Sequence, residues 1–156
     1  MKEKLEQITE LAKREDYPTA LALIDKLTAE FPNEAKVWTT KAFVNGHKGD
    51  LTAAVDDWTK AIKLVEEPHY VYMRGIELFK LRKYKEAVSD FTRVIELCDF
   101  YKSDYYREGA YFFRADAYVR LKQFEKARAD CLHVNDDMRT WTDKLRTKTE
   151  ILAECG

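Results

Sequence analysis

The sequence predicts an all-α protein of about four helical hairpins in a single domain, residues 1–156. Three observations support this prediction. Apolar residues recur three and four positions apart, which is the period of an α-helix and not of a strand. Only 5 Gly and 3 Pro interrupt the chain, and the segments between turns suit helices of about 12 to 16 residues. Finally, one residue pattern occurs four times at a nearly constant interval.

The repeated pattern is an apolar residue at a turn followed three residues later by an alanine. These alanines, at intervals of 34, 33 and 40 residues, are Ala20, Ala54, Ala87 and Ala127. Four residues beyond them stand Ile24, Trp58, Phe91 and Cys131. A small and a larger residue one helical turn apart let neighbouring helices approach and fill the space between them. We therefore expect Trp58 to be a core residue.

The first hairpin is expected over about residues 2–33. Pro18 near the start of its second helix and Pro32 beyond its end delimit that helix, because proline suits a first helical turn and stops a helix later on. Ile8 occupies the position twelve residues before Ala20, where the later repeats carry a small residue. This first repeat therefore departs from the pattern of the others.

The next three hairpins are expected over about residues 34–67, 68–100 and 103–134. Twelve residues before the repeated alanine they carry the small residues Ala42, Gly75 and Ala115. A small residue at this position allows the two helices of one hairpin to pack closely.

The 40-residue interval leaves six extra residues around positions 98–113. We interpret them as about one and a half additional helical turns, shared between the end of one helix and the start of the next. Ser103 or Asp104 is the expected helix cap, because short polar side chains accept hydrogen bonds from free backbone N–H groups.

A terminal helix is expected over about residues 137–154, outside the repeats. Its apolar positions are Met138, Trp141, Leu145, Ile151 and Leu152. Such a capping helix would seal the last hairpin.

With a period near 34 residues and paired helices, residues 2–134 resemble the tetratricopeptide repeat family. The resemblance implies a right-handed superhelical array of hairpins with a concave groove lined by the first helix of each hairpin. It also implies a non-enzymatic protein–protein interaction module that binds a protein or peptide in this groove. An enzyme built on such a scaffold would need a second domain, which 156 residues leave no room for.

The best-known subgroup of the family clamps the carboxylate terminus of chaperones with lysines, asparagines and an arginine on successive inner helices. The corresponding positions in this sequence hold Thr39, Thr40, Phe43, His69 and Met73. The resemblance therefore implies that this clamp is absent.

Two alternatives stay open within the binding class. Residues 130–155, DCLHVNDDMRTWTDKLRTKTEILAEC, resemble the C-terminal part of bacterial tetratricopeptide immunity proteins of polymorphic toxin systems. This implies an immunity protein that neutralises a cognate toxin by direct binding. The second alternative is a secretion chaperone or adaptor, since such proteins share this size and repeat type.

Composition excludes several other classes. With Lys+Arg 27 against Asp+Glu 28, the net charge of -1 gives no field to attract nucleic acid or an anionic membrane. Residues 1–16 carry charges throughout, and no run approaches the roughly 18 apolar residues of a membrane span. We expect a cytoplasmic protein. The oligomeric state is not predicted.

No residue pattern indicates catalysis, a metal or a cofactor. Cys98, Cys131 and Cys155 are too widely spaced for a disulfide framework, and Cys131 lies in the large-residue position of its repeat. We expect Cys131 to be a core residue although His133 follows it closely. The pair Asp56 and Asp57 point about 100° apart on a helix, so we interpret them as solvated charges.

The candidate partner-binding surface consists of helical positions on the first helices that hairpin packing does not use. These residues are Thr39, Phe43, His47, Tyr72, Ile76, Phe79, Lys80, Phe112, Asp116 and Arg120. The surface is aromatic in its middle and cationic along one edge, which is typical of a patch that binds protein.

Overall fold

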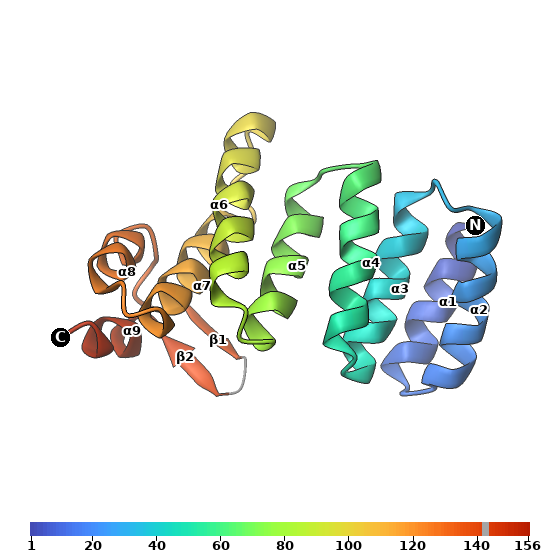
Figure 1. Cartoon of the computed structure of the whole chain (residues 1–156), viewed down its shortest axis with the longest axis horizontal. Coiled ribbons are helices and arrows are strands. Elements are labelled where there is room, and N and C mark those ends of the chain that lie inside the picture. The colour runs from blue at the N-terminus through green and yellow to red at the C-terminus, as the bar shows by residue number, and fades with distance from the viewer. Residues whose placement is uncertain (142–143) are drawn as a thin grey trace. The chain divides into compact units, whose positions relative to one another are not determined.

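The computed structural model describes residues 1–141 and 144–156 (Figure 1). The described chain is nearly all α-helical, as the sequence predicts. It divides into two compact units, Met1–Tyr70 (unit 1) and Val71–Gly156 (unit 2). The single domain expected over residues 1–156 stays a prediction. No helix in the described part has both the length and the apolar character needed to cross a membrane.

Unit 1 consists of two helical hairpins and the start of a third. Its elements are α1 (Lys2–Lys13), α2 (Tyr17–Glu30), α3 (Ala35–Lys48), α4 (Leu51–Leu64) and the first residues of α5 (Pro68–Lys80). Helix α1 packs against α2 and α3, and α3 packs against α4, so these helices lie side by side (Figure 1). Residues 2–33 contain α1 and α2, and residues 34–67 contain α3 and α4.

Local side chains set the helix ends in unit 1. The Asp16 carboxylate accepts a hydrogen bond from the Thr19 backbone N–H at 3.3 Å, and Asp50 does the same for Ala53 at 3.1 Å. These two residues are the N-caps of α2 and α4. Gly49 ends α3 with a φ of 88°, in the left-handed region that glycine adopts without strain.

The core of unit 1 follows the repeat pattern. Ala20, Ile24 and Ala54 are buried, and the Trp58 side chain is only 3% exposed. The expectation that Trp58 is a core residue is confirmed. Ile8 is also buried, so the departure from the pattern in the first repeat fills the core with a larger side chain.

Unit 2 contains two further hairpins and a short closing structure. Its elements are the rest of α5, α6 (Tyr84–Tyr101), α7 (Arg107–Arg120), α8 (Phe124–Cys131), β1 (Arg139–Trp141), β2 (Leu145–Thr147) and α9 (Lys148–Glu154). Helix α7 packs against α6 and α8, and α9 packs against α7 and α8. The ring of Phe91 stacks on that of Phe113 with centroids 5.6 Å apart, and Cys131 is buried as expected.

Four of the six extra residues lengthen α6, which has 18 residues where α3 and α4 have 14, whereas α7 also has 14 and is not lengthened. The expected cap by Ser103 or Asp104 is wrong, because α7 begins after Tyr106 and has no side-chain cap. The carboxylate of Asp104 instead accepts a hydrogen bond from Arg107 at 2.6 Å. Arg107 also forms an ion pair with Asp99 at 2.7 Å, so its guanidinium links the start of α7 to the end of α6.

The terminal helix expected over residues 137–154 is present only from Lys148. The preceding residues form an antiparallel strand pair in which Thr140 lies opposite Arg146. Thr147 and Glu150 form a capping box, in which each side chain bonds the other's backbone N–H, and this local signal starts the helix at Lys148. Leu145 and Ile151, six residues apart, would not share one face of a continuous helix.

The prediction that Asp57 is a solvated charge is wrong. Asp57 is buried and accepts a hydrogen bond from the Asn45 amide at 2.8 Å. Desolvation by burial raises the pKa of its carboxyl group, while the nearby charge of Lys41 opposes the rise. Asp90 and Asp130 occupy the equivalent positions of the next hairpins, and Arg74 and Arg114 respectively bind them through two hydrogen bonds each.

Candidate partner-binding site

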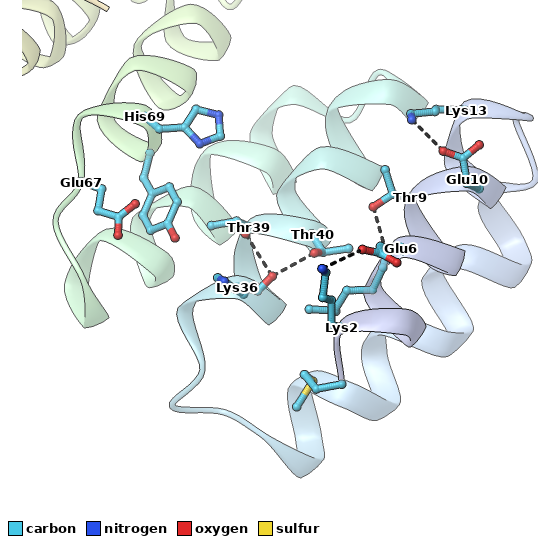
Figure 2. A pocket seen from close by; sticks show the side chains of 13 residues that line it. Lys2, Glu6, Thr9, Glu10, Lys13, Lys36, Thr39, Thr40, Glu67 and His69 are labelled. Carbon is cyan, nitrogen blue, oxygen red and sulfur yellow. Dashed lines mark hydrogen bonds and ion pairs between the residues drawn. The ribbon is translucent and has the colours of Figure 1, made fainter. Parts of the chain in front are cut away.

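The first helices of the hairpins in unit 1 surround a hollow of about 640 Å³. Its lining comes from α1, from the first turns of α3, and from the start of α5 (Figure 2). The lining residues are Met1, Lys2, Leu5, Glu6, Thr9, Glu10, Lys13, Lys36, Thr39, Thr40, Glu67, His69 and Tyr70. A volume of this size falls within the range of about 300 to 1,000 Å³ typical of ligand sites.

Helical periodicity places these side chains on one face. In α1 the lining positions recur at three- and four-residue steps, as from Lys2 to Glu6, Thr9 and Lys13. Buried Leu5 and Tyr70 give the hollow an apolar floor. Polar side chains at the rim lie around it (Figure 2).

Most polar groups of the rim are already paired within unit 1. Lys13 pairs with Glu10 at 2.7 Å, and Lys2 lies 3.9 Å from Glu6. The hydroxyls of Thr39 and Thr40 donate to the backbone carbonyl of Lys36 at 3.0 and 2.9 Å (Figure 2). No carboxylate pairs with the exposed Lys36 ammonium in the described residues, so this charge is available to a bound group.

His69 stands at the α5 side of the hollow, partly exposed. Its ring lies 5.9 Å from that of Trp58 and 5.8 Å from that of Tyr70. Desolvation lowers the pKa of His69, and the negative charge of Glu67 opposes this shift. His69 is therefore largely neutral at pH 7 and adds hydrogen-bonding capacity rather than charge.

The predicted site residues of unit 1 fall only partly within the hollow. Thr39 lines it. Phe43 is half-buried and packs against the core of unit 1, with its ring 4.1 Å from that of His47. His47 is exposed, and its backbone carbonyl accepts a hydrogen bond from the Tyr17 hydroxyl at 3.0 Å. Partner binding by these residues stays a prediction.

In unit 2, Tyr72 and Phe79 take part in an aromatic cluster centred on Phe113. Tyr72 is half-buried and packs so closely against Gly109 that a methyl group there would meet its hydroxyl at 2.5 Å. Burial raises the pKa of Tyr72 to about 12. Phe79 is buried between Phe113 and Tyr84, so the expectation that it lies at an open surface is wrong.

Three other predicted residues of unit 2, Ile76, Lys80 and Arg120, remain accessible. Ile76 is half-buried, and Lys80 is exposed, with its ammonium 3.2 Å from the Glu77 carboxylate.

The prediction that Phe112 and Asp116 lie on an open face of α7 is wrong. Both side chains are 1% exposed. Asp116 accepts two hydrogen bonds from Arg146 of β2, at 2.6 and 3.2 Å, and lies 3.4 Å from Arg120. Arg146, which follows the last hairpin, therefore covers Asp116 by binding its carboxylate.

Helix α1 contributes to the hollow, and the repeat pattern does not predict this contribution. The repeat pattern gave no site positions in the first hairpin, because Ile8 replaces the small residue from which they would be counted. The polar stripe Lys2, Glu6, Thr9 and Lys13 was the available signal.

The three cysteines are free and buried. Burial raises the pKa of the Cys131 thiol to about 11, so it carries its proton at neutral pH. The described residues contain no group of three or more His, Cys, Asp or Glu side chains arranged to hold a metal ion.

Comparison with known sequences identifies the repeats. A family model described as "Tetratricopeptide repeat" matches residues 72–132. The E3 ubiquitin-protein ligase CHIP of Arabidopsis thaliana is 28% identical over 86 residues, which are 54% of this chain and 31% of that protein. The chain thus spans less than a third of the length of this curated relative.

Solved structures show the same fold. YrrB, described as a TPR protein with an unusual peptide-binding site, gives a TM-score of 0.69 at 21% identity, over 83% of this chain and 64% of that one. MamA gives a TM-score of 0.70 at 17% identity, over 85% and 72%. Toxin neutralisation, a secretion-chaperone role and a cytoplasmic location stay predictions. Residues 72–132 thus match the tetratricopeptide repeat model, and the chain shares the fold of solved tetratricopeptide repeat proteins.

Proposed function

We propose that the chain binds a segment of another protein in the hollow of unit 1. The observation that carries this proposal is a hollow of about 640 Å³ lined by the first helices of consecutive hairpins. The similar fold of YrrB, which is described as having a peptide-binding site, supports a peptide as the ligand.

The size of the hollow suits a short extended segment. Packed helices lie about 8 to 10 Å apart, so the three lining helices span on the order of 20 Å. An extended chain advances about 3.3 Å per residue, which corresponds to about six residues. Binding such a segment buries few side chains, so we expect moderate affinity unless aromatic anchors contribute.

The lining determines the chemistry of the ligand. Leu5 and Tyr70 offer apolar surface for a side chain that points inward. The ammonium of Lys36 attracts a carboxylate or a backbone carbonyl, while Glu67 offers a carboxylate on the α5 side. Because both signs of charge occur, the ligand is expected to be a polypeptide of mixed character rather than a polyanion.

The predicted binding residues that are accessible remain candidate contacts. In unit 1 these are Thr39 and His47, and in unit 2 Ile76, Lys80 and Arg120. Rim charges such as Lys80 act mainly on association rate and on its salt dependence.

The test begins with affinity capture from the native host, followed by calorimetry with the purified partner. The double change Lys36→Glu and Thr39→Met reverses the charge at Lys36 and fills part of the hollow without touching the buried core. We expect at least about tenfold weaker binding, or about 1.4 kcal/mol. Lys26→Glu, on the exposed surface of α2 outside the hollow, is the matched control and should bind normally. An unchanged dissociation constant for the double variant would contradict the proposal.

A further inference from the structure

We propose that the surface of α7 and α8 in unit 2 is a second binding site, one that takes an arginine-bearing segment. The described residues that follow the last hairpin, 137–141 and 144–156, are called here the closing segment and occupy this site as an internal and displaceable ligand. The site lies within unit 2 and is independent of the hollow in unit 1.

Arg146 is the main anchor of the closing segment. Its side chain is 1% exposed, and two of its nitrogens donate to the two oxygens of Asp116 on α7. The third contact, to Glu154, lies within the segment and fixes the guanidinium in place. The planar guanidinium of arginine can donate two parallel hydrogen bonds to one carboxylate, whereas the ammonium of lysine cannot.

The other anchors are side-chain contacts to main-chain atoms and one apolar residue. Arg128 of α8 donates to the carbonyls of Cys155 and Gly156 at 2.6 and 3.0 Å. Lys148 donates to the carbonyl of Val134 at 2.7 Å. Ile151 is completely buried. The site thus recognises an arginine and, five residues later, a branched aliphatic side chain.

The closing segment has little stability of its own. Helix α9 has seven residues and the strands have three each, and such elements are marginal when isolated. Leu145 and Leu152 remain exposed on its outer side. The segment is therefore folded by docking, which makes it displaceable.

Departure of the segment leaves a defined site. Asp116 would keep only the single contact from Arg120 at 3.4 Å, and a buried carboxylate without a full partner is costly. The vacated surface consequently favours a segment that again supplies an arginine. Cys131 of α8 and Cys155 are both buried, and α9 packs against α8, so the two thiols report on the covered surface.

Thiol labelling measures the opening of the segment in the full-length chain. The variant Arg146→Ala with Ile151→Asp removes both anchors, and Arg139→Ala with Leu132→Asp makes the same changes at exposed positions as a matched control. Alkylation followed by mass spectrometry gives a separate rate for each cysteine. We expect Cys155 and Cys131 of the anchor variant to label at least tenfold faster than in the wild type. Cys98 of α6 should be unchanged, as should all three cysteines of the control.

A peptide supplied in trans tests the binding site itself. The probe is residues 137–156 of this chain with Cys155→Ser, added to the anchor variant. We expect it to slow Cys131 labelling at least fivefold, and the same peptide with Arg146→Ala to have no effect. Lack of protection by the first peptide, or equal protection by both, overturns the proposal.

If labelling of Cys98 also accelerates or circular dichroism shows lost helicity, the anchor variant has unfolded more widely. The single variant Arg146→Lys then tests the proposal. It keeps the charge but loses the two-pronged contact. If Cys155 of this variant labels faster while Cys98 labels at the wild-type rate, the closing segment separates from α7 and α8 without wider unfolding, and the site prefers arginine. Wild-type rates at Cys155, or equal acceleration at Cys98, overturn the proposal.

Discussion

The two units differ in what covers their first helices. In unit 1, α1, α3 and the start of α5 leave a hollow of about 640 Å³. In unit 2 the corresponding surface of α7 is covered, and Asp116 is bound by an arginine from β2. Both sets of helices carry the same repeat pattern. The repeat pattern therefore determines which face of each first helix packs within its hairpin. The residues after the last hairpin determine whether the remaining face of α7 is exposed or covered.

The units also differ in how their helices are held together. Unit 1 has an apolar cluster to which the first two hairpins contribute, including Ile8, Ile24 and Val44. Unit 2 has an aromatic cluster centred on Phe113 and, in addition, an arginine–aspartate pair within each hairpin, Arg74 with Asp90 and Arg114 with Asp130. Buried ion pairs add geometric specificity but little net stability, whereas apolar burial stabilises directly.

The largest expected effect is on the core of unit 1. Trp58→Ala should lower the free energy of unfolding by about 3–5 kcal/mol, because it empties a large buried site. Trp38→Ala is the matched control, since its indole is partly exposed, donates to the Pro32 carbonyl at 2.7 Å and lies under the Lys60 ammonium. The control should cost about 1–2 kcal/mol. Urea denaturation followed by circular dichroism measures both. A loss below about 1 kcal/mol for Trp58→Ala would show that the tryptophan does not hold the core together.

The next effect concerns the buried pair of unit 2. Asp116→Ala removes the buried carboxylate that binds Arg146 and should lower the free energy of unfolding by about 3 kcal/mol. This is the low end of the range for broken buried ion pairs, because Glu154 still contacts the arginine. Asp25→Ala removes the partner of Lys41 in unit 1, where Asp25 is mostly exposed, and should cost less than about 1 kcal/mol. If the two variants lose equal free energy of unfolding in the same denaturation experiment, burial does not make the Asp116–Arg146 pair more important for stability than an exposed pair.

A smaller effect tests the small-residue position that both units share. Gly75→Ala in unit 2 places a methyl group 2.9 Å from the buried ring of Phe91. We expect a net loss of about 1–2 kcal/mol, since overpacking outweighs the gain in helix propensity. Ala42→Gly at the equivalent position of unit 1 should lose about 1 kcal/mol for the opposite reason, lower helix propensity. Stabilisation by Gly75→Ala would show that the ring of Phe91 can move aside.

The smallest effect is the response of unit 1 to pH. The folded-state pKa of His69 is lowered, so its contribution to stability is present above the ordinary value of 6.5 and is lost as the pH falls through the folded pKa. Acidification below about pH 6.5 should therefore destabilise unit 1, modestly because the ring is partly exposed. His69→Gln should reduce this dependence. Melting temperature against pH measures it, and a proton NMR titration giving a His69 pKa at or above 6.5 would contradict it.

Much of the fold could be predicted because its determinants are local. Helical periodicity, the caps at Asp16 and Asp50 and the glycine at Gly49 act within a few residues, and the helices begin and end where these signals occur. The candidate site was harder to predict. Thr39 was identified from its helical position, but α1 was missed because Ile8 removes the reference for counting.

By itself the sequence determined the helical hairpins, their order and the burial of Trp58, since spacing along a helix decides which side chains face a neighbour. Only the tertiary structure decided that Phe112 and Asp116 are covered. Arg146 reaches Asp116 across 30 residues of chain, and no local pattern encodes such a contact. This ion pair forms only if the attraction between the two charges outweighs the cost of removing them from water. That balance depends on the folded hairpin, which holds the Asp116 carboxylate where Arg146 can reach it.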